Sequence, residues 1–415
     1  MKRLGSLLVA VGLLGWLASR HPGVRFVDFI SFGGRASGLA TGQPVVDGLY
    51  PHGYPALLAA GQLLTGDLLI FGKALSVLAG AVLVVAVATR LGLVAGAYLL
   101  AQVPLLLWGS TEGSDMLAAA LALAGLLSRS SPVAGACVGL ALATRWTAAA
   151  WVLPALWLAE SRPRFLAGLA LGFAPHLVLS AVLGGGWLPD QGLNVAIAGG
   201  GSLLARLPGG LRLAASALGA DPFAVVGGIA LVLALRQPLG RALALGALLH
   251  AVGLAAVFAN PRLALPATLA LILGPPVLLA SWKHGRATTA LLALAAAGLA
   301  TFTSRQADDE ADRAARVAAL VTAVEGELCS NTPWAYARRD GWVLPARQLS
   351  SLGPPHLLLP AGVAEHCPSV LFDAARGRGF PGLRPMLGGE AVSGWTLRAR
   401  DGALALWTTT APPSR

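Results

Sequence analysis

Charge is scarce in this sequence. Only 12% of its 415 residues are Asp, Glu, Lys or Arg, whereas a soluble domain carries about 25%. Hydrophobic residues make up 56%, and long apolar runs recur between Leu4 and Phe302. The helices of a soluble core would interrupt such runs with polar residues at helical spacing. The composition therefore excludes an ordinary soluble domain and predicts a polytopic α-helical membrane protein.

Motifs for nucleotides and metals are also missing. The sequence contains no GxxxxGKS or GxxxxGKT loop and no GxGxxG segment after a predicted strand, so ATP-driven transport is not indicated. It has no HExxH and no CxxC, the spacings that commonly hold zinc. We therefore expect no cofactor and no dedicated metal site, although a divalent cation is left open.

Cysteine is rare. Cys137 lies in an apolar run, while Cys329 and Cys367 lie in the polar C-terminal part. In an oxidising compartment the latter two could form a disulfide bond. Two unpaired buried thiols are the alternative, because sequence spacing does not reveal the distance between two side chains.

The apolar runs predict about eleven transmembrane helices within residues 1–303. Polar residues return after that point, and residues 304–415 hold 12 of the 30 Lys and Arg residues. The first run follows Lys2 and Arg3, as in a cleavable signal peptide, but residue 20 would emerge outside in either case. The expected spans are 4–18, 67–89, 92–108, 114–128, 132–144, 146–159, 165–183, 222–236, 240–258, 263–281 and 287–303.

Loop charges indicate the orientation through the positive-inside rule. They also decide whether residues 132–159 form one long helix or a hairpin of two short ones. With a hairpin, ten basic residues and one acid, Glu160, fall on one side, and the opposite loops hold seven of each sign. A single long helix removes this asymmetry. We therefore predict the hairpin and a basic cytoplasmic side, which accounts for most of the net charge of +11 without a nucleic-acid partner.

Arg145 marks the tip of this hairpin. Each arm has 13 or 14 residues, which gives about 20 Å of helix, less than the ~30 Å of a bilayer core. We therefore expect the arms to lie inside the bundle and to hold Arg145 where lipid would not tolerate it. Such a buried arginine is a candidate functional residue, and it could equally serve to stabilise the bundle.

Residues 304–415 are predicted to form a small α/β domain outside the cytoplasm. Residues 306–327 read as a helix with acids in its first turn, as the helix dipole favours. Short β runs lie at 356–359 and 369–372, and Asp401-Gly402 joins two further runs in the manner of a hairpin. With no eukaryotic feature in the sequence, we expect a bacterial inner membrane protein with a cytoplasmic N-terminus and a periplasmic C-terminal domain.

Two long outer loops separate the predicted spans. Residues 184–221 are rich in glycine, which predicts a mobile loop around a short helix. The first acid in residues 19–66 is Asp28, and the segment also contains Tyr50-Pro51-His52-Gly53-Tyr54-Pro55. Three more polar motifs stand at span ends, namely Glu112-Gly113-Ser114-Asp115, Gly139-Leu140-Ala141-Leu142-Ala143-Thr144-Arg145 and Asn260-Pro261-Arg262-Leu263-Ala264-Leu265-Pro266.

Together these motifs resemble the GT-C superfamily of membrane glycosyltransferases, especially its protein mannosyltransferase and aminoarabinose transferase branch. In that branch the first motif commonly reads Tyr-Pro-Pro-Gly-Tyr-Pro. The segment before Arg145 is similar to the family's Gly-Leu-Ala-x-x-Thr-Lys hairpin, and the segment after Arg262 to its Arg-Tyr-x-x-Pro stretch. The resemblance covers nearly the whole chain through short motifs. It implies a membrane domain, residues 1–303, followed by an outward-facing domain, residues 304–415.

The resemblance also implies transfer of a sugar from a polyprenyl-phosphate carrier to an extracytoplasmic glycan, lipid or protein. This chemistry needs a carboxylate that takes the acceptor's proton and cations that stabilise the departing phosphate. Asp28 is the candidate base, and Arg145 and Arg262 are candidate phosphate ligands, since arginine binds phosphate bidentately. Further candidate substrate contacts are Asp115, Tyr50, His52 and Tyr54.

Several of these residues also have simpler explanations. Asp28 could be an ordinary loop acid, and Phe29 follows it where the family often has a second acid. Asp115 could cap the helix that starts at residue 114. His52 replaces the family's usual proline and could pack at the interface.

Two other functions compete with the transferase. A secondary transporter or flippase would show inverted repeats, and a membrane scaffold would need no catalytic residues. Convergence of Asp28, Arg145 and Arg262 on one outer cavity would favour the enzyme.

Overall fold

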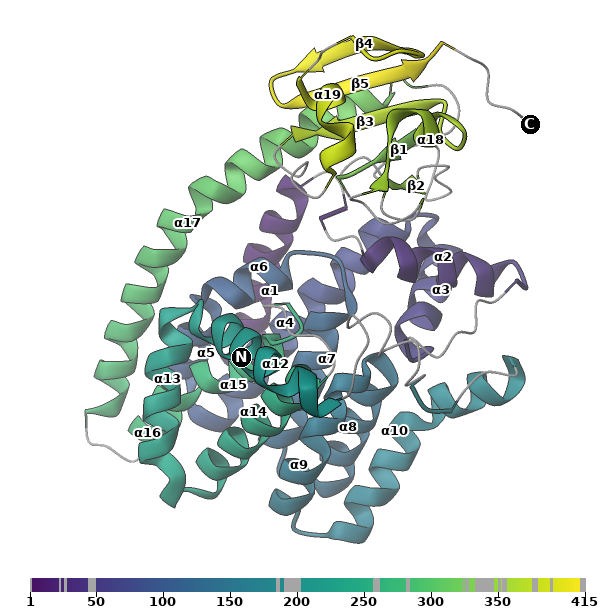
Figure 1. The fold of residues 1–415 in the computed structure, drawn as a ribbon. Coiled ribbons are helices and arrows are strands. Elements are labelled where there is room, and N and C mark those ends of the chain that lie inside the picture. The colour runs from purple at the N-terminus through teal and green to yellow at the C-terminus, as the bar shows by residue number, and fades with distance from the viewer. Residues whose placement is uncertain are drawn as a thin grey trace. The chain divides into compact units, whose positions relative to one another are not determined.

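The computed structural model (Figure 1) is largely helical, with one small sheet near the C-terminus. It forms two compact units. The helical unit comprises Met1–Ala18, Gly34–Leu64 and Ile70–Ser304, and the sheet unit comprises Ser19–Gly33, Thr65–Leu69 and Arg305–Arg415. The described residues are 2–21, 24–25, 28–43, 50–183, 187–189, 203–256, 262–280, 284–322, 324, 328–332, 347–349, 352, 357–374, 380–388 and 391–410.

Three described helices are long and apolar enough to cross a bilayer: Leu68–Leu91, Arg162–Leu183 and the stretch Pro238–Ala255. A fourth span results if Leu207–Gly219 and Pro222–Arg236, which meet at 103°, are counted as one. The shorter apolar helices have 10–17 residues. The number of eleven spans therefore stays a prediction, while the helical character of the apolar runs is confirmed.

The predicted spans coincide with helices, but prolines divide two of them. Residues 92–108 form α5 (Leu93–Leu100) and α6 (Val103–Gly109), with Pro104 in the first turn of α6. Residues 263–281 form α15 (Leu265–Ile272) and α16 (Gly274–Leu279), whose first turn contains Pro275 and Pro276. Proline lacks an N–H and is best tolerated in the first turn of a helix. The predicted spans also contain further helices. They are α1 (Lys2–Arg20), α4 (Leu68–Leu91), α7 (Ser114–Leu127), α10 (Arg162–Leu183), α13 (Pro222–Leu233), η2 (Ala234–Arg236), α14 (Pro238–Ala256) and the first half of α17 (Gly285–Thr322).

The predicted hairpin is present. Helix α8 (Ser131–Thr144) ends at Arg145, whose extended backbone (φ −151°, ψ 132°) breaks the helix. The chain returns through η1 (Trp146–Trp151) and α9 (Val152–Leu158). The Ser161 N–H donates to the Ser131 Oγ at 3.0 Å, so the end of the second arm lies beside the start of the first. Arg145 therefore stands at the tip.

Glycines allow α8 to pack closely against α10. A Cβ added at Gly135 or Gly139 of α8 would overlap the backbone of α10, and one at Gly168 or Gly172 would overlap the backbone of α8. Both pairs have the small-xxx-small spacing through which helices approach closely in membranes. This packing fixes the position of the first arm, and with it the position of Arg145.

Both long outer loops contain more helix than expected. Residues 19–66 include α2 (Asp28–Ala40) and α3 (Gly53–Thr65). The second loop includes α12 (Leu203–Gly219), a helix of 17 residues, and residues 190–202 lie outside the described part. The short helix expected within residues 184–221 is therefore present and is long, and the first loop is helical in much of its described part.

The sheet unit contains five strands in the order β2-β1-β3-β5-β4. Strand β1 (Leu328–Ser330) pairs in parallel with β2 (Arg347–Gln348) and β3 (Ser369–Asp373), while β5 (Leu404–Thr409) pairs antiparallel with β3 and β4 (Trp395–Asp401). The hairpin at Asp401-Gly402 and the strand at 369–372 are confirmed. The strand expected at 356–359 is wrong, because residues 357–359 form no strand.

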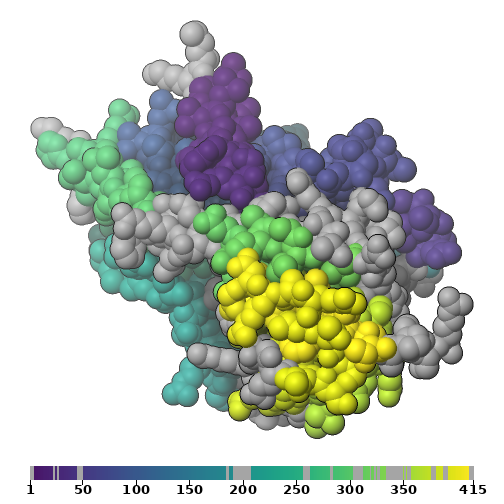
Figure 2. Space-filling model, turned by 90° about the horizontal axis from the view of Figure 1, so that it is seen from above, coloured from purple at the N-terminus to yellow at the C-terminus, as the bar shows by residue number. Residues whose placement is uncertain are grey.

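Apolar side chains cover both faces of this sheet. Val370 and Phe372 of β3 join one cluster, and Leu371 between them joins another with Val317 and Val321 of α17. The side chains of β4 alternate between buried and exposed, as in an edge strand. Figure 2 shows the β4–β5 hairpin in yellow at the surface. Helices α18 (Pro360–Ala364) and α19 (Arg384–Gly388) and the turn η7 (Pro381–Leu383) complete the described part of the unit.

Cys329 and Cys367 form a disulfide bond, with Cα atoms 5.8 Å apart. The bond joins β1 to the segment that precedes β3 and lies inside the buried cluster of this unit. Of the two possibilities that the sequence left open, the structure therefore has the disulfide. Disulfides persist in oxidising compartments, so the bond agrees with a location outside the cytoplasm.

Candidate functional site

Helix α7 begins at an unusual backbone position. Gly113 precedes it with φ 142°, a region that side chains rarely adopt, and no side chain caps the first turn. Asp115 lies in this first turn and is 6% exposed. A helix N-terminus favours a carboxylate through its dipole. The side chain of Asp115 is nevertheless not a hydrogen-bonding cap, so its partners lie elsewhere.

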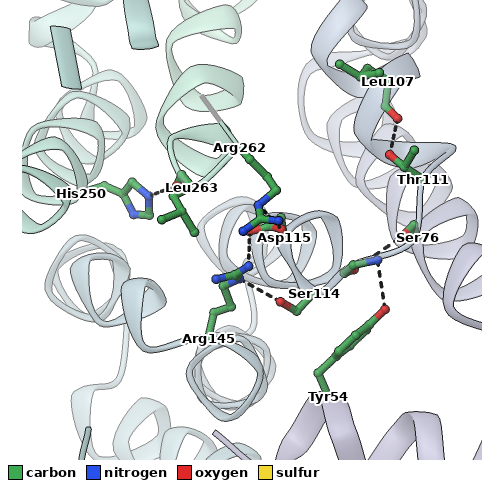
Figure 3. A network of polar contacts seen from close by, with 11 residues as sticks. Tyr54, Ser76, Leu107, Thr111, Ser114, Asp115, Arg145, His250, Arg262 and Leu263 are labelled. Carbon is green, nitrogen blue, oxygen red and sulfur yellow. Dashed lines mark hydrogen bonds and ion pairs between the residues drawn. The ribbon is translucent and has the colours of Figure 1, made fainter. Parts of the chain in front are cut away.

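Two arginines bind the Asp115 carboxylate (Figure 3). The Arg145 Nη2 lies 2.9 Å from one carboxylate oxygen, and the Arg262 Nε lies 3.3 Å from the other. The exposed fractions of the two guanidinium side chains are only 8% and 13%. Buried charges need partners because transfer out of water is costly. Within this triad two guanidinium groups thus share one carboxylate.

The three members of the triad come from distant segments. Asp115 starts α7, Arg145 is the hairpin tip, and Arg262 lies in the turn before α15. Arg145 is also held by Ser114, whose Oγ accepts from the Arg145 Nε at 2.8 Å. The structure thus brings together both predicted phosphate ligands and the candidate contact Asp115. Asp115 also lies in the first turn of α7, where an acid is favoured, so its choice between helix-end acid and substrate contact stays a prediction.

The Tyr50–Pro55 element lies beside the same triad. The ring centroid of Tyr50 is 5.9 Å from the Arg145 Cζ and 5.2 Å from the Arg35 Cζ, within reach of a cation–π contact. Tyr54 is fully buried, and its hydroxyl accepts from the Gly113 N–H at 3.1 Å (Figure 3). Burial raises the pKa of Tyr54, which keeps this hydroxyl protonated.

His52 is buried and packs on a second histidine. Its backbone N–H donates to the His176 Nδ1 at 3.2 Å, and the two rings stack with centroids 5.3 Å apart. The His176 Nε2 lies 3.3 Å from the Trp187 carbonyl, to which it donates because Nδ1 acts as the acceptor. Trp146, next to Arg145, packs edge-on against His176 at 4.9 Å. In this structure His52 is therefore a packing residue of the Tyr50–Pro55 element.

His250 holds the backbone next to Arg262 in place. Its Nδ1 accepts from the Trp151 Nε1 at 3.3 Å, and its Nε2 donates to the Leu263 carbonyl at 2.8 Å (Figure 3). The imidazole thus ties the return arm of the hairpin to the residue next to Arg262. Both ring nitrogens have partners, which is the structural role expected of a histidine inside a bundle.

Asp28 is the first residue of α2 and is half-buried. It belongs to the sheet unit, whereas Arg145 and Arg262 belong to the helical unit. The convergence of all three residues on one outer cavity therefore stays a prediction.

Sequence reasoning missed Lys73. This residue lies in α4 and is only 8% exposed. One turn further along the same helix, the Ser76 Oγ donates to the Gly113 carbonyl at 3.4 Å. A single lysine within an otherwise apolar span was the available signal, because an ionisable residue at membrane depth is a functional candidate by default.

No cluster of three or more His, Cys, Asp or Glu side chains suited to a metal ion occurs among the described residues. The described residues do not include 190–202 and 333–346. The residues of the triad would offer a metal only one carboxylate, which two guanidinium groups already engage.

No protein-family model matches the chain, and no curated protein matches it significantly. Among solved structures, the chain is similar to ArnT from Cupriavidus metallidurans bound to undecaprenyl phosphate, with 13% sequence identity, a TM-score of 0.52 and 98% coverage of both chains. It also matches the arabinofuranosyltransferase AftD from Mycobacteria at 14% identity and a TM-score of 0.36, over 98% of this chain and 40% of that one. The similarity to ArnT supports the GT-C fold and does not single out a branch.

Proposed function

We propose that this chain is a GT-C glycosyltransferase that moves a sugar from a polyprenyl-phosphate carrier to an acceptor outside the cytoplasm. The observation that carries the proposal is the buried triad of Asp115, Arg145 and Arg262, in which two guanidinium groups share one carboxylate. Two guanidinium groups side by side suit a phosphate. ArnT, which shares the fold, was solved with undecaprenyl phosphate.

The reaction assigns a separate task to each residue. The acceptor hydroxyl oxygen forms a bond to the anomeric carbon, and the bond from that carbon to the carrier phosphate breaks. The electron pair stays on the phosphate oxygen, where Arg145 and Arg262 stabilise the added charge. The proton of the hydroxyl goes to the carboxylate of Asp28 as general base.

Asp115 has a positioning task in this scheme. Two guanidinium groups repel each other, and the carboxylate between them holds both in place before the donor arrives. A guanidinium has five N–H donors, so one arginine can pair with a carboxylate and bind a phosphate at the same time. Tyr50, beside Arg145, is assigned to the donor, while Tyr54 and His52 hold the backbone of this element in place.

The test is a transfer assay with the unmutated protein. Membranes that contain the chain should move label from a radiolabelled polyprenyl-phosphate sugar to an acceptor extract, and membranes without it should not. Failure with hexose and pentose donors alike would contradict the transferase. Label that crosses the membrane without transfer would instead identify a flippase, and no use of the carrier lipid would identify a scaffold.

The orientation of the helical unit in the membrane is part of the proposal. Arg90, Arg129, Glu160 and Gln237 line one common hollow, so loops that the charge rule assigns to the cytoplasm meet at the same end of the unit. The disulfide of the sheet unit fits an oxidising compartment on the other side. We therefore propose a bacterial inner membrane, a cytoplasmic N-terminus and a periplasmic sheet unit.

Cysteine labelling in intact cells checks this orientation. Ser393 and Ser130 are both exposed, the first in the sheet unit and the second in the turn between α7 and α8. In a Cys137→Ala background, Ser393→Cys should react with a membrane-impermeant maleimide, while Ser130→Cys should react only after permeabilisation. Each change replaces one oxygen with sulfur, so the two variants are matched. The opposite labelling pattern would invert the topology.

A further inference from the structure

The end of the helical unit that carries the basic loops contains a hollow of about 480 Å³. A neighbouring hollow of about 530 Å³ shares Arg90, Ser128 and Arg129 with it. Volumes of this size are typical of small-molecule sites. Neither hollow includes a residue of the Asp115 triad, so this feature is separate from the candidate active site.

Four segments form the first hollow. They are the C-terminal end of α4, the turn from α7 to α8, the end of α9, and the start of α14 with the residue before it. The turn is held in place because the Ser130 N–H donates to the Ser128 Oγ at 3.2 Å, and the Ser161 N–H donates to the Ser131 Oγ. Arg129 projects from this fixed three-residue turn, so the two hollows have a defined polar border.

The border is basic and the walls are apolar. Arg90 and Arg129 are exposed, and within the described part of the chain no ion pair joins either of them to Glu160, the acid that also lines the first hollow. Deeper walls come from Leu91, Leu126, Ala134, Ala155, Leu158 and Leu239. Such walls gain by contact with hydrocarbon rather than water, and guanidinium groups bind phosphate. A soluble anion would satisfy the border and leave the walls in water.

We propose that this hollow binds an acidic phospholipid of the cytoplasmic leaflet, with its phosphate between Arg90 and Arg129 and the start of an acyl chain against the leucine and alanine walls. Basic pockets between helices at this membrane surface are suited to anionic headgroups. The bound lipid would join the α7–α8 turn to α4, α9 and α14. The proposal rests on the membrane orientation proposed above and does not depend on the transferase reaction.

The proposal is tested by lipid titration of the purified full-length protein, followed by native mass spectrometry. Phosphatidylglycerol should bind at least about ten-fold more tightly than phosphatidylcholine with the same chains, since each basic side chain at an anionic surface contributes about five-fold in affinity. The variant Arg90→Gln/Arg129→Gln should lower phosphatidylglycerol affinity by about 25-fold. Arg129→Gln alone, at an exposed turn, should lower it by about five-fold and serves if the double variant fails to fold.

A matched control removes two charges at the same end. Arg162 and Arg164 are exposed in the first turn of α10, next to Ser161, and line neither hollow. Arg162→Gln/Arg164→Gln should leave phosphatidylglycerol affinity nearly unchanged. Ala159→Trp, which keeps all charges and fills the first hollow, should lower the affinity of phosphatidylglycerol and phosphatidylcholine alike.

Three results would overturn the proposal. Equal losses in the two double variants would mean general surface attraction, and equal binding of the two lipids would mean no headgroup selection. Inorganic phosphate that displaces phosphatidylglycerol at similar concentration would mean a site for a soluble anion. The transfer assay reports separately on the proposed enzyme, so failure of one proposal is distinguishable from failure of the other.

Discussion

Asp28→Asn is expected to slow sugar transfer by about 10²–10⁴-fold while leaving donor binding largely unchanged, because general-base catalysis contributes about this much to rate. Asparagine is nearly isosteric with aspartate but cannot accept the proton of the attacking hydroxyl. Asp28 is half-buried at the start of α2, where asparagine is also well tolerated. The measurement is kcat for transfer in membranes with equal amounts of inserted protein.

Asp67 supplies a matched control for this substitution. Like Asp28, it belongs to the sheet unit. It precedes α4, and its Oδ1 accepts a hydrogen bond from the Leu69 N–H at 2.9 Å. Asparagine caps a helix about as well as aspartate. Asp67→Asn should therefore retain activity, whereas Asp28→Asn should not. Full activity in Asp28→Asn would remove this residue as the base, and equal losses in both variants would indicate a structural effect.

Arg145→Ala and Arg262→Ala are each expected to lower kcat/KM for the lipid donor by about 10- to 100-fold. The estimate follows from the roughly 1.5–3 kcal/mol of a hydrogen bond to a charged group, with each 1.4 kcal/mol worth ten-fold. Because both arginines contact the same carboxylate, the two effects should not be additive. The readouts are donor kinetics and competition by polyprenyl phosphate without sugar.

Folding needs its own control here, since each alanine substitution breaks one buried ion pair of Asp115, a change that can destabilise the fold. Arg145→Lys and Arg262→Lys keep the charge but lose the bidentate geometry, so they should recover part of the activity. Arg241→Ala removes an exposed arginine that stacks on Trp157 at 4.9 Å, away from the triad. This variant should leave kcat/KM for the lipid donor unchanged. Alanine variants that insert properly and use the donor normally would make the triad purely structural.

Local chemistry determined much of this fold. Long apolar runs predict helices because in lipid every backbone polar group must be satisfied within the segment. The loop charges alone predicted the hairpin at Arg145. Asp401-Gly402 predicted its β-hairpin because glycine accepts the positive φ of 59° that Gly402 has. The prolines that divide two spans were equally visible and could have been read as breaks.

Other features depended on contacts between distant segments. Asp115 in a first turn suits a helix dipole, and only the tertiary structure showed that it also binds Arg145 and Arg262. The burial of Lys73 was likewise visible only in the tertiary structure. The disulfide required Cys329 and Cys367 to meet after 38 residues of chain.

The sequence by itself thus predicted the apolar helices, the hairpin and the candidate phosphate ligands, because those predictions follow from local hydropathy, charge and spacing. The tertiary structure decided which of these residues meet. Helix packing brought Arg145 and Arg262 to the carboxylate of Asp115. Close backbone contacts at Gly135, Gly139, Gly168 and Gly172 hold the hairpin in place. Sequence spacing does not carry this information, since a buried charge takes whichever partner the packing of other helices presents.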